Sequence, residues 1–154
     1  MRAAIPVAFL VLSLNVSACA EPFTPADLAG SYTLAGEDGQ SLPRLLSATI
    51  ECDVFLVGGA LRLQADQSFV LDLAEQIDCS RSGGPVQDAG RNYPGTFVLR
   101  GHDIDFTSPR YGQEPITFHG AELGGIVAIK IVDADISAWG HLKPVFETDR
   151  RTQR

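Results

Sequence analysis

Apolar and polar side chains alternate with a period of two along much of this chain, and no long segment repeats with the period of an amphipathic helix. The alternation is clearest at residues 96–100 and 103–107, which flank a Gly101-His102 turn and therefore predict a β-hairpin. Because a period of two places successive side chains on opposite faces of a strand, this pattern predicts a β protein with one buried face.

Short apolar runs separated by turn residues recur at regular spacing through the rest of the chain. Further strands are expected at residues 30–34, 40–43, 49–57 continuing through Gly58-Gly59 into 60–64, 69–73, 116–119, 125–132 and 136–146. Turns at 36–39 and 108–112 and a loop at 80–92, rich in glycine, proline and serine, separate them. We expect an all-β domain at residues 28–147, an antiparallel meander of about eight strands in a closed or nearly closed barrel, with a two-sheet β-sandwich as the alternative. A disordered tail is expected at residues 148–154.

The large apolar side chains fall on one face of these strands and are expected to form the core. They are Tyr32, Leu34, Leu61, Leu63, Phe69, Leu71, Leu73, Phe97, Leu99, Ile104, Phe106, Ile116, Phe118, Ile129 and Trp139. A barrel of about eight strands either holds one small ligand or is filled by its own side chains, and the eight phenylalanines and one tryptophan favour a filled interior. In a hollow barrel, the residues expected to contact a small apolar ligand are Tyr32, Phe69, Leu71, Phe97, Phe106, Phe118 and Trp139.

Residues 1–18 have the features of a cleaved signal peptide, with a basic residue followed by an apolar segment too short to cross a bilayer as a helix. The segment that ends at Cys19 (VSAC) resembles the lipobox of bacterial lipoproteins. The resemblance implies that Cys19 is acylated and anchors the protein in a membrane through a tether at residues 19–27. Because Ala20 is not an aspartate, it implies the outer membrane, with the domain facing the periplasm. Cleavage by an ordinary signal peptidase, which would give a secreted protein, is the alternative.

Cys52 and Cys79 then form an even pair in an oxidising compartment, and we expect a disulfide between them. Apolar runs on either side of residues 65–68 predict a hairpin turn there. The two cysteines lie thirteen residues from the centre of that turn on each side, so a continuous ladder would bring them opposite one another. A β-bulge in the glycine pair at 58–59 would shift this register.

The composition and the motifs give no sign of catalytic chemistry. A net charge of −7, with scattered acidic residues, argues against nucleic acid as a partner. The chain has no nucleophile elbow, phosphate-binding loop or HExxH motif, so we expect neither an enzyme nor a cofactor or metal site.

The three histidines, His102, His119 and His141, are interpreted as surface residues. Asp103 and Asp105 share one strand face and could pair with His119 or Lys130 as an acid–base or metal site. Alternate acidic residues are ordinary on a solvent-facing strand, and the sequence favours that interpretation.

The Gly30-Ser31-Tyr32 step at the start of the first expected strand, followed by a meander of hairpins behind a lipoprotein signal, resembles the lipocalin-like lipoproteins of bacteria. The resemblance covers residue 28 to about residue 146 and implies an up-and-down barrel of about eight strands. One expected function is an envelope-anchored lipoprotein whose barrel binds a small hydrophobic or amphipathic ligand, with the loop 80–92 as a lid. The alternative is a structural or protein-interaction module of the envelope with a filled barrel.

Overall fold

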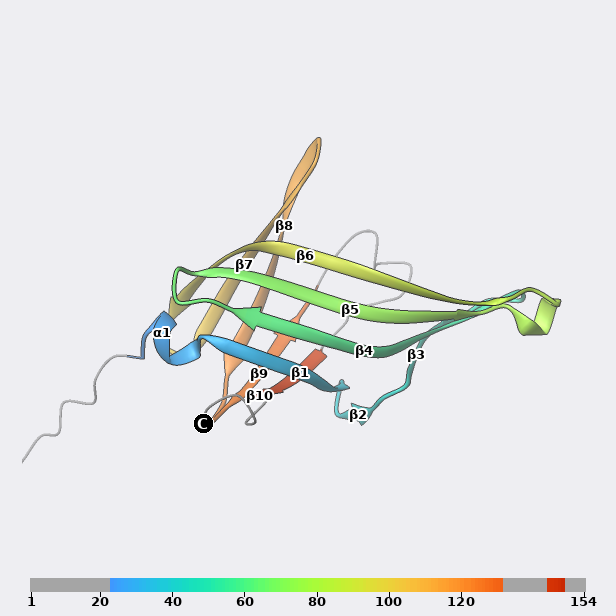
Figure 1. Cartoon of the computed structure of the whole chain (residues 1–154), viewed down its shortest axis with the longest axis horizontal. Helices are drawn as coiled ribbons and strands as arrows, with labels where there is room; N and C mark the ends of the chain where they lie inside the picture. The colour runs from blue at the N-terminus through green and yellow to red at the C-terminus, as the bar shows by residue number, and fades with distance from the viewer. Residues whose placement is uncertain (1–22, 132–143, 149–154) are drawn as a thin grey trace, which may run out of the picture.

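Ten strands form one antiparallel sheet in the computed structural model, which describes residues 23–131 and 144–148 (Figure 1). Their order is β2-β1-β10-β9-β8-β7-β6-β5-β4-β3, and β1 also pairs with β4. This last pairing closes eight of the strands into a barrel and leaves β2 and β3 outside it. The expected meander barrel is therefore confirmed, and the β-sandwich alternative is wrong because the hydrogen-bonded ladder closes on itself.

The helices and strands have the following bounds: α1 Pro25–Leu28, β1 Gly30–Glu37, β2 Gln40–Ser41, β3 Arg44–Ala48, β4 Asp53–Leu63, β5 Ser68–Asp78, the 3-10 helix η1 Ser80–Ser82, β6 Val86–Arg100, β7 Asp103–Arg110, β8 Gln113–Glu122, β9 Ile126–Lys130 and β10 Pro144–Thr148.

The barrel interior follows the alternation of the sequence. Every expected core residue that the structure describes is buried, except Leu99, which is partly buried against the core. In β7, for example, Ile104 and Phe106 are buried while Asp103 and Thr107 are exposed. The core also contains Leu28, Val127, Ile131, Leu56, Tyr93 and Phe146, which the sequence pattern did not assign. Trp139 lies outside the described residues.

A short helix leads into the barrel where a tether was expected up to residue 27. Pro25 occupies its first turn, where a missing N–H costs nothing, and the Asp27 carboxylate accepts hydrogen bonds from the backbone N–H (2.8 Å) and the hydroxyl (2.6 Å) of Thr24. The Tyr32 hydroxyl donates to the Leu28 carbonyl at 2.6 Å. These contacts fasten the helix to the end of β1, so regular structure starts before the barrel does.

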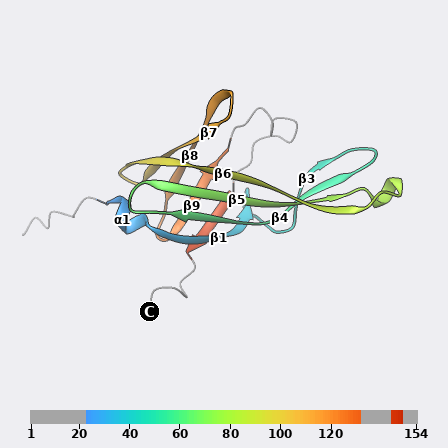
Figure 2. The same ribbon diagram turned by 45° about the horizontal axis from the view of Figure 1, so that its top comes forward.

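Strands β4, β5 and β6 run on beyond the barrel and form an arm (Figures 1 and 2). The arm consists of β3 with residues 53–56 of β4, 75–78 of β5 and 86–89 of β6, paired in that order. Two expectations are wrong here. The supposed loop 80–92 is strand from Val86 onward, so it is not a lid. The strand expected from residue 49 starts only at Asp53, because residues 49–52 form a turn that follows a separate strand, β3. The composition of these segments was misleading, because exposed strands outside the barrel carry few large apolar residues and therefore resemble loops.

The Cys52–Cys79 disulfide lies at the tip of the arm and is confirmed, with 4.1 Å between the two Cα atoms. A β-bulge at Val57 shifts the β4–β5 register by one residue. Without this shift the hairpin ladder would place Cys52 opposite Ser80. The bulge, one residue before the glycine pair where it was considered, is thus what aligns the cysteines.

Candidate functional site

The six described members of the expected ligand-contacting set are all buried in the barrel core. Their rings pack on one another: the centroid of Phe106 lies 5.0 Å from that of Phe69, 5.3 Å from that of Phe118 and 6.2 Å from that of Phe97. Edge-on and stacked pairs at these distances fill the space between the strands that carry them. Trp139, the seventh member, lies outside the described residues, and a ligand inside the barrel stays a prediction.

Two buried ion pairs lie where the arm leaves the barrel. Arg91 Nε is 2.7 Å from Glu75 Oε1, and Arg44 Nε is 3.2 Å from Glu37 Oε2. Both carboxylates are almost fully buried, and each has its own arginine. Burial is the largest influence on the pKa of Arg91 and lowers it, but the hydrogen bond and charge of Glu75 outweigh burial and raise that pKa overall. Because the charges of each pair cancel, we interpret these ion pairs as structural contacts that leave no net charge for binding a ligand.

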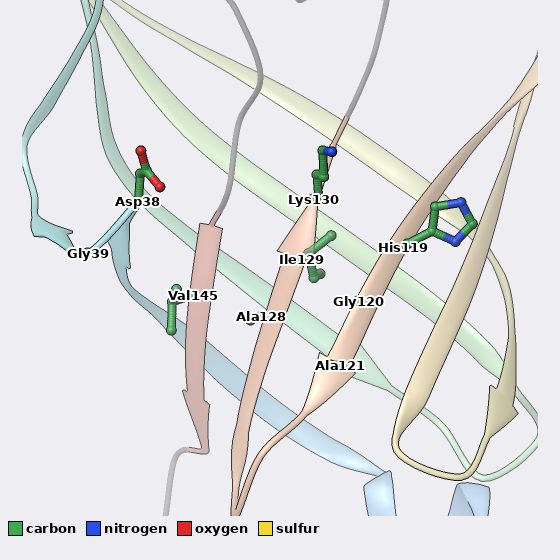
Figure 3. Close-up of a pocket in the computed structure, with 9 residues that line it drawn as sticks. All are labelled: Asp38, Gly39, His119, Gly120, Ala121, Ala128, Ile129, Lys130 and Val145. Carbon is green, nitrogen blue, oxygen red and sulfur yellow. The ribbon is translucent and has the colours of Figure 1, made fainter.

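An open groove of about 430 Å³ lies on the outside of the barrel, over β8, β9 and β10 (Figure 3). Its floor is a row of three small apolar side chains that face one another across these strands: Ala121 pairs with Ala128, and Ala128 pairs with Val145. The turn at Asp38 and Gly39 borders the groove on one side, as Figure 3 shows. We call this site the outer groove. Small outward residues leave a depression here because larger neighbours stand on both sides of them.

The first strand continues the row of the floor, since Gly36 pairs with Val145. A Cβ atom on Gly36 would lie 2.5 Å from the Gln40 carbonyl oxygen, so only glycine lets β2 approach this closely. The close approach brings the Asp38-Gly39 turn up against β10 and forms the side wall of the outer groove.

Charged side chains line the opposite side of the outer groove. His119 and Lys130 are cross-strand neighbours on β8 and β9. His119 Nδ1 lies 2.6 Å from Asp105 Oδ1, and Arg100 Nε lies 3.2 Å from the other oxygen of that carboxylate. Lys130 forms no ion pair with any residue in the described part of the chain. Its ammonium is the positive charge that the outer groove can offer to a ligand, and the Asp38 carboxylate borders the other side.

The outer groove is equipped for binding by burial and charge. Its nine described lining residues include no serine, threonine or cysteine that could act as a nucleophile. Within residues 23–131 and 144–148, no group of three histidine, cysteine or acidic side chains is arranged to hold a metal ion. The volume falls in the range of about 300–1,000 Å³ that is typical of small-molecule sites.

The structure brings together only part of the acid–base or metal site considered from the sequence. Asp105 contacts His119, while Asp103 is exposed at the start of β7. His102, interpreted as a plain turn residue, has its Nδ1 3.0 Å from Glu122 Oε2 and stacks on Phe23 with centroids 5.1 Å apart. His141 lies outside the described residues.

Sequence reasoning missed the floor of the outer groove because alanine and valine carry no chemical signal. The available signal was the run of small outward residues around positions 120–128, at positions where the other strands carry polar side chains.

Comparison of the sequence with protein-family models and with curated proteins found no match. The lipocalin-like resemblance therefore has the closed eight-strand barrel as its support. Of the helices in the described ranges, none is long and apolar enough to cross a membrane.

Proposed function

We propose that this protein is an envelope-anchored binding module that takes a small amphipathic carboxylate in the outer groove, outside the barrel. The observation that carries the proposal is the ammonium of Lys130, which forms no ion pair with a described residue, beside an apolar floor made by Ala121, Ala128 and Val145. An apolar floor with a few placed polar groups is the usual composition of a ligand site. The packed rings of the described interior favour this outside location over a site between the strands.

The dimensions of the outer groove set the size of the ligand. Its floor crosses three strands, and neighbouring strands lie about 4.8 Å apart, so the floor is about 10 Å across. A medium-length acyl chain matches this width, with its carboxylate at Lys130. We propose a carrier or sensor role for this site.

The envelope location rests on the sequence of the N-terminal segment. Residues 16–19 resemble a lipobox, and the disulfide between Cys52 and Cys79 suits an oxidising compartment. We propose the outer membrane, facing the periplasm, with secretion of the unanchored protein as the alternative.

Octanoate titrated into the protein carrying Cys19→Ser, followed by amide chemical shifts and calorimetry, tests the ligand proposal. Saturable shifts are expected at Ala121, Ala128, Lys130 and Val145. Lys130→Gln should weaken octanoate binding by about fivefold, the value of about 1 kcal/mol for an exposed ion pair, and leave octanol binding unchanged. Lys130→Arg keeps the charge and should keep the affinity.

A large side chain in the floor gives a second, independent arm of the test. Ala128→Trp fills the outer groove from its centre and should abolish octanoate binding. Thr117→Trp is the matched control, because Thr117 is also exposed on β8 but is not among the residues that line the groove. Octanoate shifts that fail to saturate, or that ignore Ala128→Trp, would rule the site out.

The protein-interaction role, the alternative drawn from the sequence, is favoured by a different observation. Several exposed large apolar side chains lie on the arm or at its tip: Leu45, Ile50 and Val86. Leu45 lies on β3, Ile50 in the turn at residues 49–52 and Val86 on β6, and none of them lines the outer groove.

A further inference from the structure

One long stretch of the sheet has an open edge. Strand β6 runs from Val86 to Arg100 and pairs with β5 from Val86 to Thr96, but it pairs with β7 only from Thr96 onward. No described strand pairs with residues 86–93 on the β7 side. Figures 1 and 2 show β7 and β8 diverging from β6.

The direction of the free backbone groups follows from two hydrogen bonds of β6. The Phe97 N–H donates to the Gln67 carbonyl on the β5 side, at 2.8 Å. The Pro94 carbonyl accepts from the Ser108 hydroxyl on the β7 side, at 2.7 Å. Because N–H and C=O groups of successive residues alternate between the two sides of a strand, the even-numbered residues direct theirs toward the open edge. These are Val86, Asp88, Gly90 and Asn92, all of them exposed.

Two other edges of the described sheet are blunted. Strand β3 has a register irregularity between Leu45 and Ser47, and β2 is only two residues long. Bulges and short strands are devices by which proteins prevent unwanted strand pairing. The edge at residues 86–93 has neither, and it contains no proline or lysine. A regular, unblunted row of donors and acceptors is a surface for strand addition.

We infer that residues 87–93 of β6 pair in antiparallel fashion with the same residues of a second copy of this chain, about a twofold axis at Gly90. In this register Asp88 faces Asn92 of the second copy and Ala89 faces Arg91 of the second copy, so no like charges oppose each other. The segment carries one acidic and one basic residue, whereas the whole chain has a net charge of −7, so this edge is a place where two copies meet with little repulsion. The two arms then form one continuous sheet. This inference does not depend on the outer groove.

Photo-crosslinking of the full-length protein in Gram-negative cells tests the inference. Val86 is 53% exposed and is replaced by p-benzoylphenylalanine. The expected product has twice the mass of the chain, and mass spectrometry should place the crosslink near Pro94 of the second copy. A crosslink to a different protein, a crosslink within one chain, or no crosslink overturns the inference.

A proline at the edge supplies the matched pair of variants. Asp88→Pro removes an N–H that points to the open edge and should lower the yield of crosslinked dimer by about tenfold, while Asp88→Ala keeps the N–H and should leave the yield unchanged. The Cys52–Cys79 disulfide, measured by non-reducing mass spectrometry, reports whether the arm of each variant is folded. Equal dimer yields in two folded variants contradict the pairing.

Discussion

Phe106 and Asp105 are chain neighbours in β7 with opposite surroundings. Phe106 is fully buried and packs against the rings of Phe69 and Phe118. Asp105 points outward, where its carboxylate contacts His119 and Arg100 near the solvent. At the scale of single residues, the side of the strand therefore decides whether a side chain contributes to stability.

Phe106→Ala should lower the free energy of unfolding by about 3–5 kcal/mol, because it leaves a cavity among packed rings. Asp105→Ala should cost no more than about 1 kcal/mol, since exposed ion pairs contribute little. Urea melts of the two variants measure both values. A larger loss for Asp105→Ala would mean that the assigned inner and outer faces of β7 are reversed.

Tyr32 links the entry helix to the barrel and also carries a pH effect. Burial raises the pKa of the Tyr32 phenol above its ordinary 10.0, and the nearby charge of Glu122 raises it further. The folded state holds the Tyr32 proton more tightly than the unfolded state does. The contribution of Tyr32 to the free energy of unfolding is therefore complete below about pH 10 and is lost as the pH rises through the raised pKa.

Tyr32→Phe should cost about 1–2 kcal/mol at neutral pH, since the Leu28 carbonyl loses its 2.6 Å hydrogen bond. As the pH rises above about 10, the variant should lose less stability than the wild type. Chemical unfolding at several pH values measures the difference, and parallel curves for the two proteins would contradict the assigned pKa direction.

At the scale of elements, the arm is held differently from the barrel. The barrel strands share the aromatic core, whereas the distal strands rely on the disulfide at the tip, the Arg81–Asp53 ion pair (2.5 Å) and backbone pairing. Regions with fewer buried apolar contacts open at lower free energy. The disulfide is therefore expected to set the stability of the arm.

Cys52→Ala combined with Cys79→Ala should lower the free energy of unfolding by about 3–4 kcal/mol in the chain-entropy model for a loop of this length. Hydrogen exchange should accelerate most at residues 53–56 and 75–78 and least in the barrel part of β5. Chemical reduction of the wild type should give the same pattern. Uniform acceleration over all strands would show that the arm and barrel unfold as one unit.

At the scale of the whole molecule, we propose that the N-terminal segment anchors the barrel at a membrane. Cys19 lies four residues before Phe23, which stacks on His102 at the barrel. An acyl anchor at Cys19 would therefore hold the barrel close to the membrane surface.

Expression of the full-length chain in a Gram-negative host with a labelled fatty acid should label the wild type and not Cys19→Ser. Fractionation should place the wild type with the membranes, because two or three acyl chains give stable anchoring. An unlabelled, water-soluble wild type would show that an ordinary signal peptidase cleaves the segment.

Local patterns in the sequence determined much of the fold. The alternation at residues 103–107 fixed the inner face of β7, because a slip of one residue would bury Asp105. The Gly101-His102 turn fixed the β6–β7 hairpin, in which Arg100 pairs with Asp103. In each case the deciding residues are neighbours along the chain, so their geometry follows from strand periodicity and turn chemistry alone.

Tertiary structure alone decided the features that join distant segments. The pairings of β1 with β4 and β10 close the barrel, and the floor of the outer groove combines Ala121, Ala128 and Val145 from three strands. The bulge at Val57 aligns the cysteines, and the extension of β6 past β7 leaves an open edge. These features depend on which strands pair and in what register. The residues involved are small or polar, and their contribution to strand pairing depends on the neighbours that surround them in the closed sheet.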